Sequence, residues 1–97
     1  MTADETRRFL DCLTYEDNTI KLYGKVYWCL GVTYDQNTEI YAMYVYEGDP
    51  VTYKSIRDLF AIESTSRDEC MQCFIEDKFW DGKSFYEVAS DIDWVDL

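Results

Sequence analysis

The chain has 97 residues and a mass of 11.6 kDa, which suffices for one domain and leaves no room for a second hydrophobic core. Hydrophobic residues make up 47% of the chain and aromatic residues 18%, so the composition excludes a disordered protein. The 20 acidic and 9 basic residues give a net charge of −11, which argues against binding to nucleic acid or to an anionic membrane surface.

The sequence predicts neither a membrane span nor a signal peptide. No apolar run approaches the roughly 18–20 residues that a membrane-crossing helix needs. Charged side chains at residues 4–8 argue against an N-terminal signal peptide. We therefore expect a cytoplasmic protein whose four cysteines stay reduced.

The first half of the chain predicts a helix followed by an antiparallel meander. Thr2 and Glu5 match a capping box, and apolar residues at helical spacing follow, which predicts a helix over residues 3–13. The apolar period then changes from helical spacing to two, with short polar turns between the runs. The predicted strands are residues 19–23, 26–33 and 39–47.

The second half is less regular. Residues 51–63 fit either a capped helix or a short strand over 59–62, and we favour the strand because polar residues follow it directly. Capping patterns predict a helix over 67–79 that ends before a left-handed Gly82, and a last short helix that begins at Ser84. The predicted fold class is α+β. A small antiparallel sheet of three to four strands packs with one N-terminal and two C-terminal helices, in a single domain that spans the chain.

Four cysteines equal the number that a zinc site needs, but only Cys70 and Cys73 have ligand spacing. These two lie within a helical pattern, where the tight turn of a zinc knuckle is missing. Acidic neighbours would raise the pKa of these thiols, which disfavours redox chemistry. Cys12 and Cys29 stand alone, and the chain has no His to complete a metal site. We predict that all four are small buried hydrophobic residues.

The acidic residues do not form a catalytic or metal-binding pattern. Adjacent carboxylates on a helix point to different sides, and two of the acidic pairs lie at helix starts, where capping explains them. Asp91, Asp93 and Asp96 lack the glycine and the terminal glutamate of a calcium loop. The sequence also lacks a phosphate-binding loop and a nucleophile elbow. We predict a protein that is not an enzyme and that has no cofactor and no metal.

Tyrosine is the other unusual feature. Seven of the nine tyrosines lie between residues 23 and 53, and the strand over 39–47 carries them on both faces. Exposed tyrosines beside acidic residues are typical of protein recognition surfaces. Helices that cover the sheet on both sides would explain the same pattern equally well.

Two resemblances bear on function. The segment from Phe79 to Val88, followed by Asp91-Ile92, resembles the C-terminal stretch of small uncharacterised proteins from Firmicutes and their mobile elements. The size, the acidity and the order of one helix, three strands and two helices resemble phage anti-CRISPR proteins that inhibit Cas9 by imitating DNA. The second resemblance implies an inhibitor whose carboxylates occupy a basic channel, and it transfers no particular residue.

The leading functional prediction is therefore a non-catalytic acidic binding protein, in the form of a DNA mimic that blocks a nucleic-acid-binding protein or nuclease of the CRISPR or restriction type. Residues 63–97 carry ten acids and three bases, a net charge of −7 that would suit a basic partner. The first alternative is a protein-interaction module that uses a Tyr-rich sheet face, with an acidity that only aids solubility. The second alternative is a small thiol or zinc protein. The candidate partner-binding residues are Asp35, Glu39, Glu47, Asp49, Glu76, Asp77, Asp81, Asp91, Asp93 and Asp96.

Overall fold

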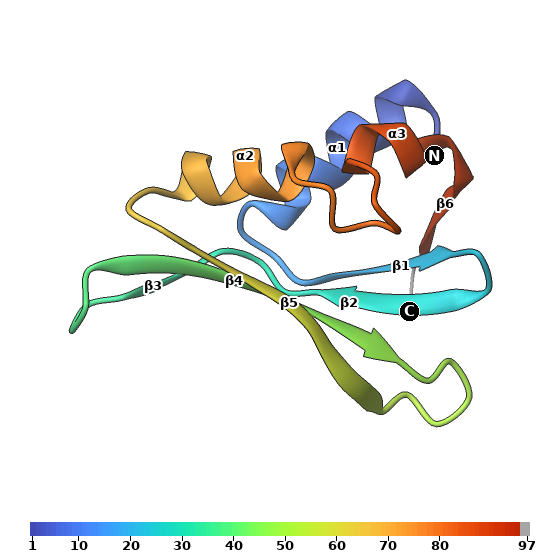
Figure 1. Ribbon diagram of the computed structural model, residues 1–97, viewed down its shortest axis with the longest axis horizontal. Coiled ribbons are helices and arrows are strands. Elements are labelled where there is room, and N and C mark those ends of the chain that lie inside the picture. The colour runs from blue at the N-terminus through green and yellow to red at the C-terminus, as the bar shows by residue number, and fades with distance from the viewer. Residues whose placement is uncertain (96–97) are drawn as a thin grey trace.

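Residues 1–95, which the computed structural model describes, form three α-helices, one 3₁₀-helix and six strands (Figure 1). The predicted α+β class is confirmed, although the sheet is larger than the three or four strands expected. In chain order the elements are α1 (Ala3–Leu13), β1 (Asn18–Leu22), β2 (Lys25–Cys29), β3 (Thr33–Asp35), β4 (Ile40–Gly48), β5 (Ser55–Ser64), α2 (Arg67–Glu76), α3 (Phe85–Val88), η1 (Ala89–Asp91) and β6 (Ile92–Val95).

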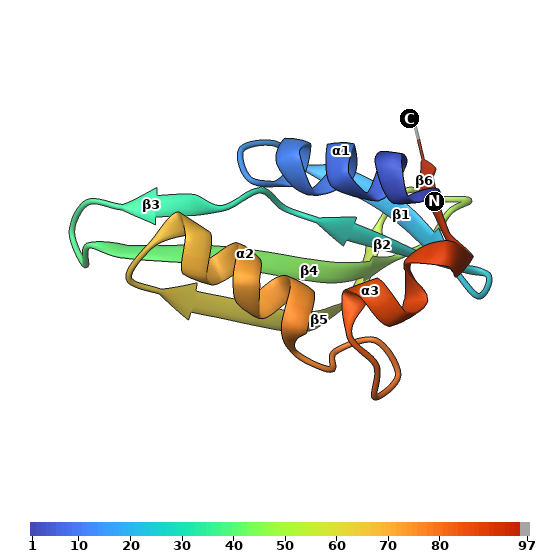
Figure 2. The same ribbon diagram turned by 90° about the horizontal axis from the view of Figure 1, so that it is seen from above.

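The strands form one antiparallel sheet in which β4 is central (Figure 2). β5 pairs along the length of β4 on one side. On the other side, β3 pairs with the first part of β4 and β2 pairs with its last part. β1 follows β2, and β6 pairs with β1 at the edge of the sheet. The end of the chain therefore packs beside a strand that is formed near its beginning.

The strand predicted over 26–33 is divided because the chain must pass close to the end of α1. A Cβ atom at Gly31 would lie 2.8 Å from the backbone nitrogen of Glu16, so no larger residue fits there. The N–H of Gly31 donates to Asp17 Oδ1 at 2.8 Å instead of joining a strand ladder. β2 consequently ends at Cys29, and β3 begins again at Thr33.

The helix predictions are confirmed in position but not in every boundary. α1 has the predicted bounds and the complete Thr2–Glu5 capping box. α2 ends at Glu76, earlier than the predicted residue 79, because Asp77 is extended. This change of direction lets Phe79 stack on Phe60 of β5, with ring centroids 4.0 Å apart.

Two strand assignments differ from the sequence analysis. Residues 55–64 form one long strand, so the favoured strand over 59–62 was correct in type but too short. β6 was not predicted at all. It pairs with β1 through residues that are about 70 positions away in the chain, and such a non-local pairing leaves no local sequence signal.

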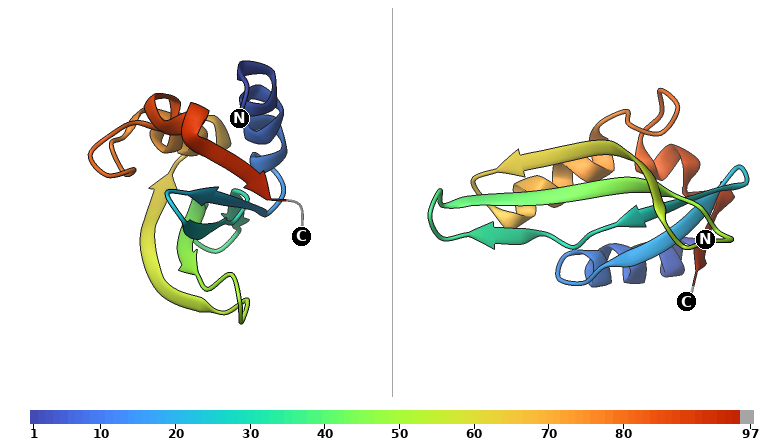
Figure 3. Two further views of the ribbon diagram at one scale, coloured as in Figure 1. Left: turned by 90° about the vertical axis from the view of Figure 1, so that its right-hand side faces the viewer. Right: turned by 90° about the horizontal axis from the view of Figure 1, so that it is seen from below.

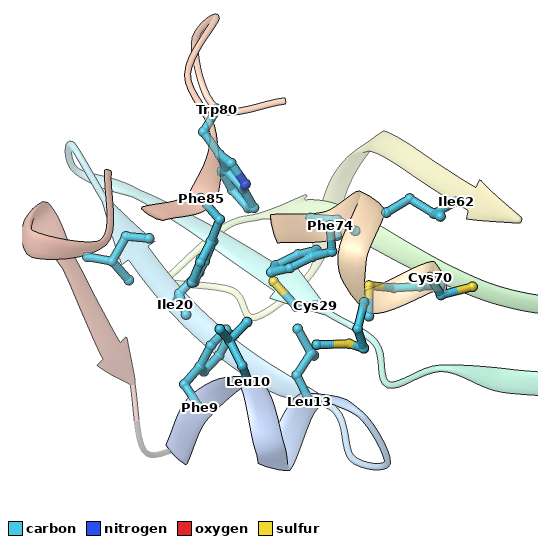
Figure 4. Packing of buried hydrophobic residues seen from close by; sticks show 14 of the residues in the cluster. Phe9, Leu10, Leu13, Ile20, Cys29, Ile62, Cys70, Phe74, Trp80 and Phe85 are labelled. Atoms are coloured by element: carbon cyan, nitrogen blue, oxygen red, sulfur yellow. The ribbon is translucent and has the colours of Figure 1, made fainter. Parts of the chain in front are cut away.

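All the helices lie on one side of the sheet, as Figures 1 and 3 show. Between the helices and the sheet lies one cluster of buried residues, part of which is drawn in Figure 4. Phe85 lies at its centre, with its ring centroid 5.6 Å from that of Phe9 and 5.0 Å from that of Phe74. None of the helices within residues 1–95 combines the length and the apolar composition that crossing a membrane would require.

Candidate functional site: the open face and its groove

The sheet surface that faces away from the helices has no helix over it (Figure 3), and we call it the open face. Met43 and Val45 of β4 are fully buried under the helices, so the alternating residues Tyr44 and Tyr46 point to the open face. Residues directly opposite in paired strands share a face, which places Trp28 beside Tyr46. Tyr44 is 38% exposed. The open face therefore presents a row of aromatic side chains to solvent.

The paired positions of the open face are acidic as well as aromatic. Asp58 lies opposite Tyr46, and Glu63 lies opposite Ala42. By the same register, Asp35 of β3 and Asp93 of β6 point to the open face at its two ends. Lys21 lies opposite Asp93 on the same face. All of these charged side chains are exposed. The aromatic row thus lies between carboxylates.

A groove of about 700 Å³ opens where the open face meets the start of β1 and the β4–β5 loop. Aromatic and apolar side chains form much of its wall. Its charged residues are both acidic, Glu5 and Asp17. Among residues 1–95, the lining consists of Glu5, Asp17, Asn18, Thr19, Trp28, Leu30, Tyr53, Trp94 and Val95.

Two aromatic walls of this groove depend on unusual backbone positions. A Cβ atom on Gly48 would lie 2.5 Å from Cε2 of Trp28, so the indole occupies the space that any other residue would need. Tyr53 has a positive φ of 56°, which is uncommon for a bulky residue. Its N–H donates to the carbonyl of Asp49 at 2.8 Å, and the Asp49 N–H donates to the carbonyl of Lys54 at 2.8 Å. These bonds hold Tyr53 in place at the loop tip.

The acidic walls are also fixed by the backbone. Asp17 Oδ1 accepts from the N–H of Gly31, and Glu5 Oε1 accepts from the N–H of Thr2 at 3.0 Å. The bond from Thr2 lowers the pKa of Glu5, because it favours the ionised carboxylate. Trp94 donates from Nε1 to Asn18 Oδ1 at 3.1 Å. The groove is therefore anionic at neutral pH and has ordered walls.

The structure does not gather the ten predicted partner-binding carboxylates on one surface. Asp35 and Asp93 belong to the open face, whereas Glu76 and Asp77 are exposed at the end of α2 on the helical side. Asp96 lies outside the described residues. The other predicted residues occupy turns, a loop, the 3₁₀-helix or the sheet: Glu39, Glu47, Asp49, Asp81 and Asp91.

Several of those residues have structural contacts of their own. Asp49 Oδ1 accepts from the N–H groups of Val51 and Thr52, and these bonds lower its pKa. Asp91 accepts a hydrogen bond from the hydroxyl of Tyr23 at 2.9 Å. Both carboxylates are thereby explained without a partner.

Glu47 differs most from the expectation of an exposed contact residue. It is 9% exposed, and it lies on the helix-covered side of the sheet. Its carboxylate contacts Arg57 Nε at 2.6 Å and Lys25 Nζ at 3.8 Å. This site is paired within the chain, so Glu47 is not available to an external partner in this arrangement.

Sequence reasoning missed four acidic residues that do line the open face or its groove: Glu5, Asp17, Asp58 and Glu63. Glu5 looked like a helix cap, which it also is. Asp58 and Glu63 could be placed only once β5 was known to pair along all of β4. The tyrosines along residues 39–47 were the signal for an exposed aromatic face, but they did not identify which face it is.

The cysteines are not arranged as a reactive site. Cys29 and Cys70 are fully buried, and no cysteine in residues 1–95 is in a disulfide. Burial raises the pKa of the Cys29, Cys70 and Cys73 thiols, and the Asp77 carboxylate raises that of Cys73 further. Within residues 1–95, no group of three cysteine or carboxylate side chains is placed to hold a metal ion.

The fold and this surface together define a class: an α+β domain with one helix-covered sheet face and one open, aromatic and acidic face. Comparison of the chain with protein-family models, with curated proteins and with solved structures finds no match.

Proposed function

We propose that this chain is a non-catalytic binding protein whose open face recognises a basic protein. The observation that supports this most strongly is the aromatic row of Trp28, Tyr44 and Tyr46, which no helix covers and which carboxylates border. Tyr and Trp contribute most to binding energy at protein interfaces. Carboxylates around them select a basic partner and speed its association.

The positions of the carboxylates favour this recognition over imitation of duplex DNA. A duplex presents one negative charge per ~1.7 Å of axis, so a mimic needs many acids on a single surface. Here Glu76 and Asp77 lie on the helical side, while Asp35 and Asp93 lie on the open face. The experiment must therefore distinguish recognition by the open face from the action of a DNA mimic of the anti-CRISPR or anti-restriction type.

The test uses matched aromatic variants. A protein that the immobilised chain captures from a lysate is identified and purified, and its Kd is measured by calorimetry. Tyr44→Ser removes an exposed ring from the open face, and Tyr86→Ser removes a ring that is 62% exposed on α3. We expect Tyr44→Ser to weaken binding by about tenfold or more, and Tyr86→Ser to leave it unchanged.

A pair of charge reversals provides the second arm. Glu63→Lys on the open face and Glu76→Lys on α2 each change the net charge from −11 to −9, since each replacement adds two. We expect only Glu63→Lys to weaken the complex, and we expect binding to fall as salt shortens the Debye length from about 10 Å at 0.1 M to about 3 Å at 1 M. Equal effects of both reversals would contradict recognition by the open face. Displacement of the chain by duplex DNA, with Tyr44→Ser silent, would instead establish the DNA mimic.

A further inference from the structure

The groove beside the open face has the composition of a cation receptor. Trp28 and Tyr53 supply aromatic rings, and Glu5 and Asp17 are its charged residues. Aromatic faces and carboxylates both attract organic cations. The net charge of −11 makes the groove unfavourable for an anion.

Asp17 keeps one carboxylate oxygen available to a ligand. Asp17 uses Oδ1 for the N–H of Gly31, and Glu5 uses Oε1 for the N–H of Thr2. Oδ2 of Asp17 has no hydrogen bond to any other residue in 1–95. A ligand with several N–H donors could therefore bind without breaking a contact that holds the fold.

The chain already binds one guanidinium in this manner. Arg67 places its Cζ 4.7 Å from the ring centroid of Tyr15 and 5.5 Å from that of Tyr41. Its Nη1 donates to the carbonyl oxygens of Thr14 and Val32, at 2.9 Å and 2.6 Å. Aromatic rings beside carbonyl oxygens thus hold a guanidinium within this fold, and the groove combines aromatic rings with carboxylate oxygens.

We infer that the groove binds an arginine side chain of the partner, stacked on Trp28 or Tyr53 and hydrogen-bonded to Asp17. The inference rests on the proposed function, and it specifies which residue of a basic partner is recognised. A guanidinium fits better than an ammonium group because it is planar and stacks on aromatic rings while it donates a hydrogen bond to the available carboxylate oxygen. The volume of about 700 Å³ accommodates the side chain together with flanking backbone.

The three tryptophans of the chain allow a direct test. Trp28 and Trp94 line the groove, whereas Trp80 is 2% exposed in the core. Acetyl-arginine N-methylamide is titrated into ¹⁵N-labelled protein while the indole N–H signals are followed by NMR. We expect the signals of Trp28 and Trp94 to shift in a saturable way and that of Trp80 to stay in place.

Two comparisons make the assignment specific. The citrulline analogue has the same shape without the charge, and it should bind about tenfold more weakly or worse. The lysine analogue should also bind more weakly than arginine. Asp17→Asn keeps the Oδ1 acceptor for Gly31 and removes the charge, so it should weaken arginine binding severalfold. The matched variant Asp77→Asn removes an exposed carboxylate at the end of α2, outside the groove lining, and should have no effect.

Equal binding of arginine and citrulline, equal binding of arginine and lysine, or equal effects of Asp17→Asn and Asp77→Asn would overturn the groove assignment. None of these results alone would overturn the proposed function. A basic partner that is sensitive to Tyr44→Ser but indifferent to Asp17→Asn would bind the open face without using the groove. The experiments therefore distinguish failure of the groove assignment from failure of the proposed function.

Discussion

Replacing Gly48 by alanine tests whether the packing of Trp28 on the sheet shapes the open face. The added Cβ would lie 2.5 Å from Cε2 of the indole and 2.6 Å from its Nε1. Non-bonded carbon atoms rest about 3.5–4.0 Å apart, so the ring must move by roughly 1 Å or more. Trp28 is half-buried and faces solvent on one side, which gives it room to move outward.

Two opposing terms set the expected change in the free energy of unfolding. Overpacking costs about 1–3 kcal/mol, and the partial exposure of Trp28 favours the lower part of that range. Replacement of a strand glycine gains about 0.5–1 kcal/mol through the lower entropy of the unfolded chain. We therefore expect Gly48→Ala to destabilise the protein by about 1 kcal/mol.

The sign should reverse when the indole is absent. In a Trp28→Leu background the clash disappears, and Gly48→Ala should become neutral or slightly stabilising. Urea unfolding followed by far-UV circular dichroism measures all four proteins without relying on tryptophan fluorescence. The same destabilisation in both backgrounds would refute the argument, since it would show that the cost does not come from Trp28.

Three further predictions concern the fold. Gly31→Ala should destabilise by about 2–4 kcal/mol in urea unfolding, because its Cβ would meet the backbone nitrogen of Glu16 at 2.8 Å and backbone yields less than a side chain. Native-state thiol labelling, followed by mass spectrometry, should modify the half-buried Cys73 before the fully buried Cys29, and early labelling of Cys29 would contradict the burial. The Ser84 N–H lowers the pKa of Glu87 below its ordinary 4.5, so its ionised form adds stability that is present above that value and is lost as the pH falls through the folded-state pKa. The difference in unfolding free energy between the natural chain and Glu87→Gln should accordingly vanish near pH ~2, and a difference that persists there would have another origin.

Local signals predicted those parts of the fold that depend on neighbouring residues. The capping box of Thr2 and Glu5 defined α1, and the alternation along residues 39–47 defined the two faces of β4. β6 could not be found in this way, because its four residues gain a strand conformation only by pairing with β1. The length of β5 likewise follows from its partner, since its first four residues are all exposed and show no alternation.

The candidate site was harder to predict than the fold, because its position depends on the side of the sheet that the helices cover. The tyrosines on both faces of β4 allowed either face to be the exposed one, and only the placement of every helix on the same side decides between them. Glu47 shows the same difficulty for charge. In the sequence it is one more acid of a strand, yet the register directs it toward Arg57 and away from the open face.

The acidic residues of the open face affect both self-association of the chain and binding of a partner. An uncovered sheet face with exposed aromatic rings would tend to self-associate, and charged residues at Asp58 and Glu63 oppose this. The same carboxylates would attract a basic partner. Neutral replacement by Asn or Gln weakens both effects, because it removes the charge and keeps the shape. Charge reversal to lysine repels a basic ligand, but it also introduces a cation that can pair with the remaining acids of a second copy. The two effects are therefore separated by two measurements on one neutralised variant: the Kd for a basic partner reports partner selection, and the oligomeric state of the free chain reports protection from self-association.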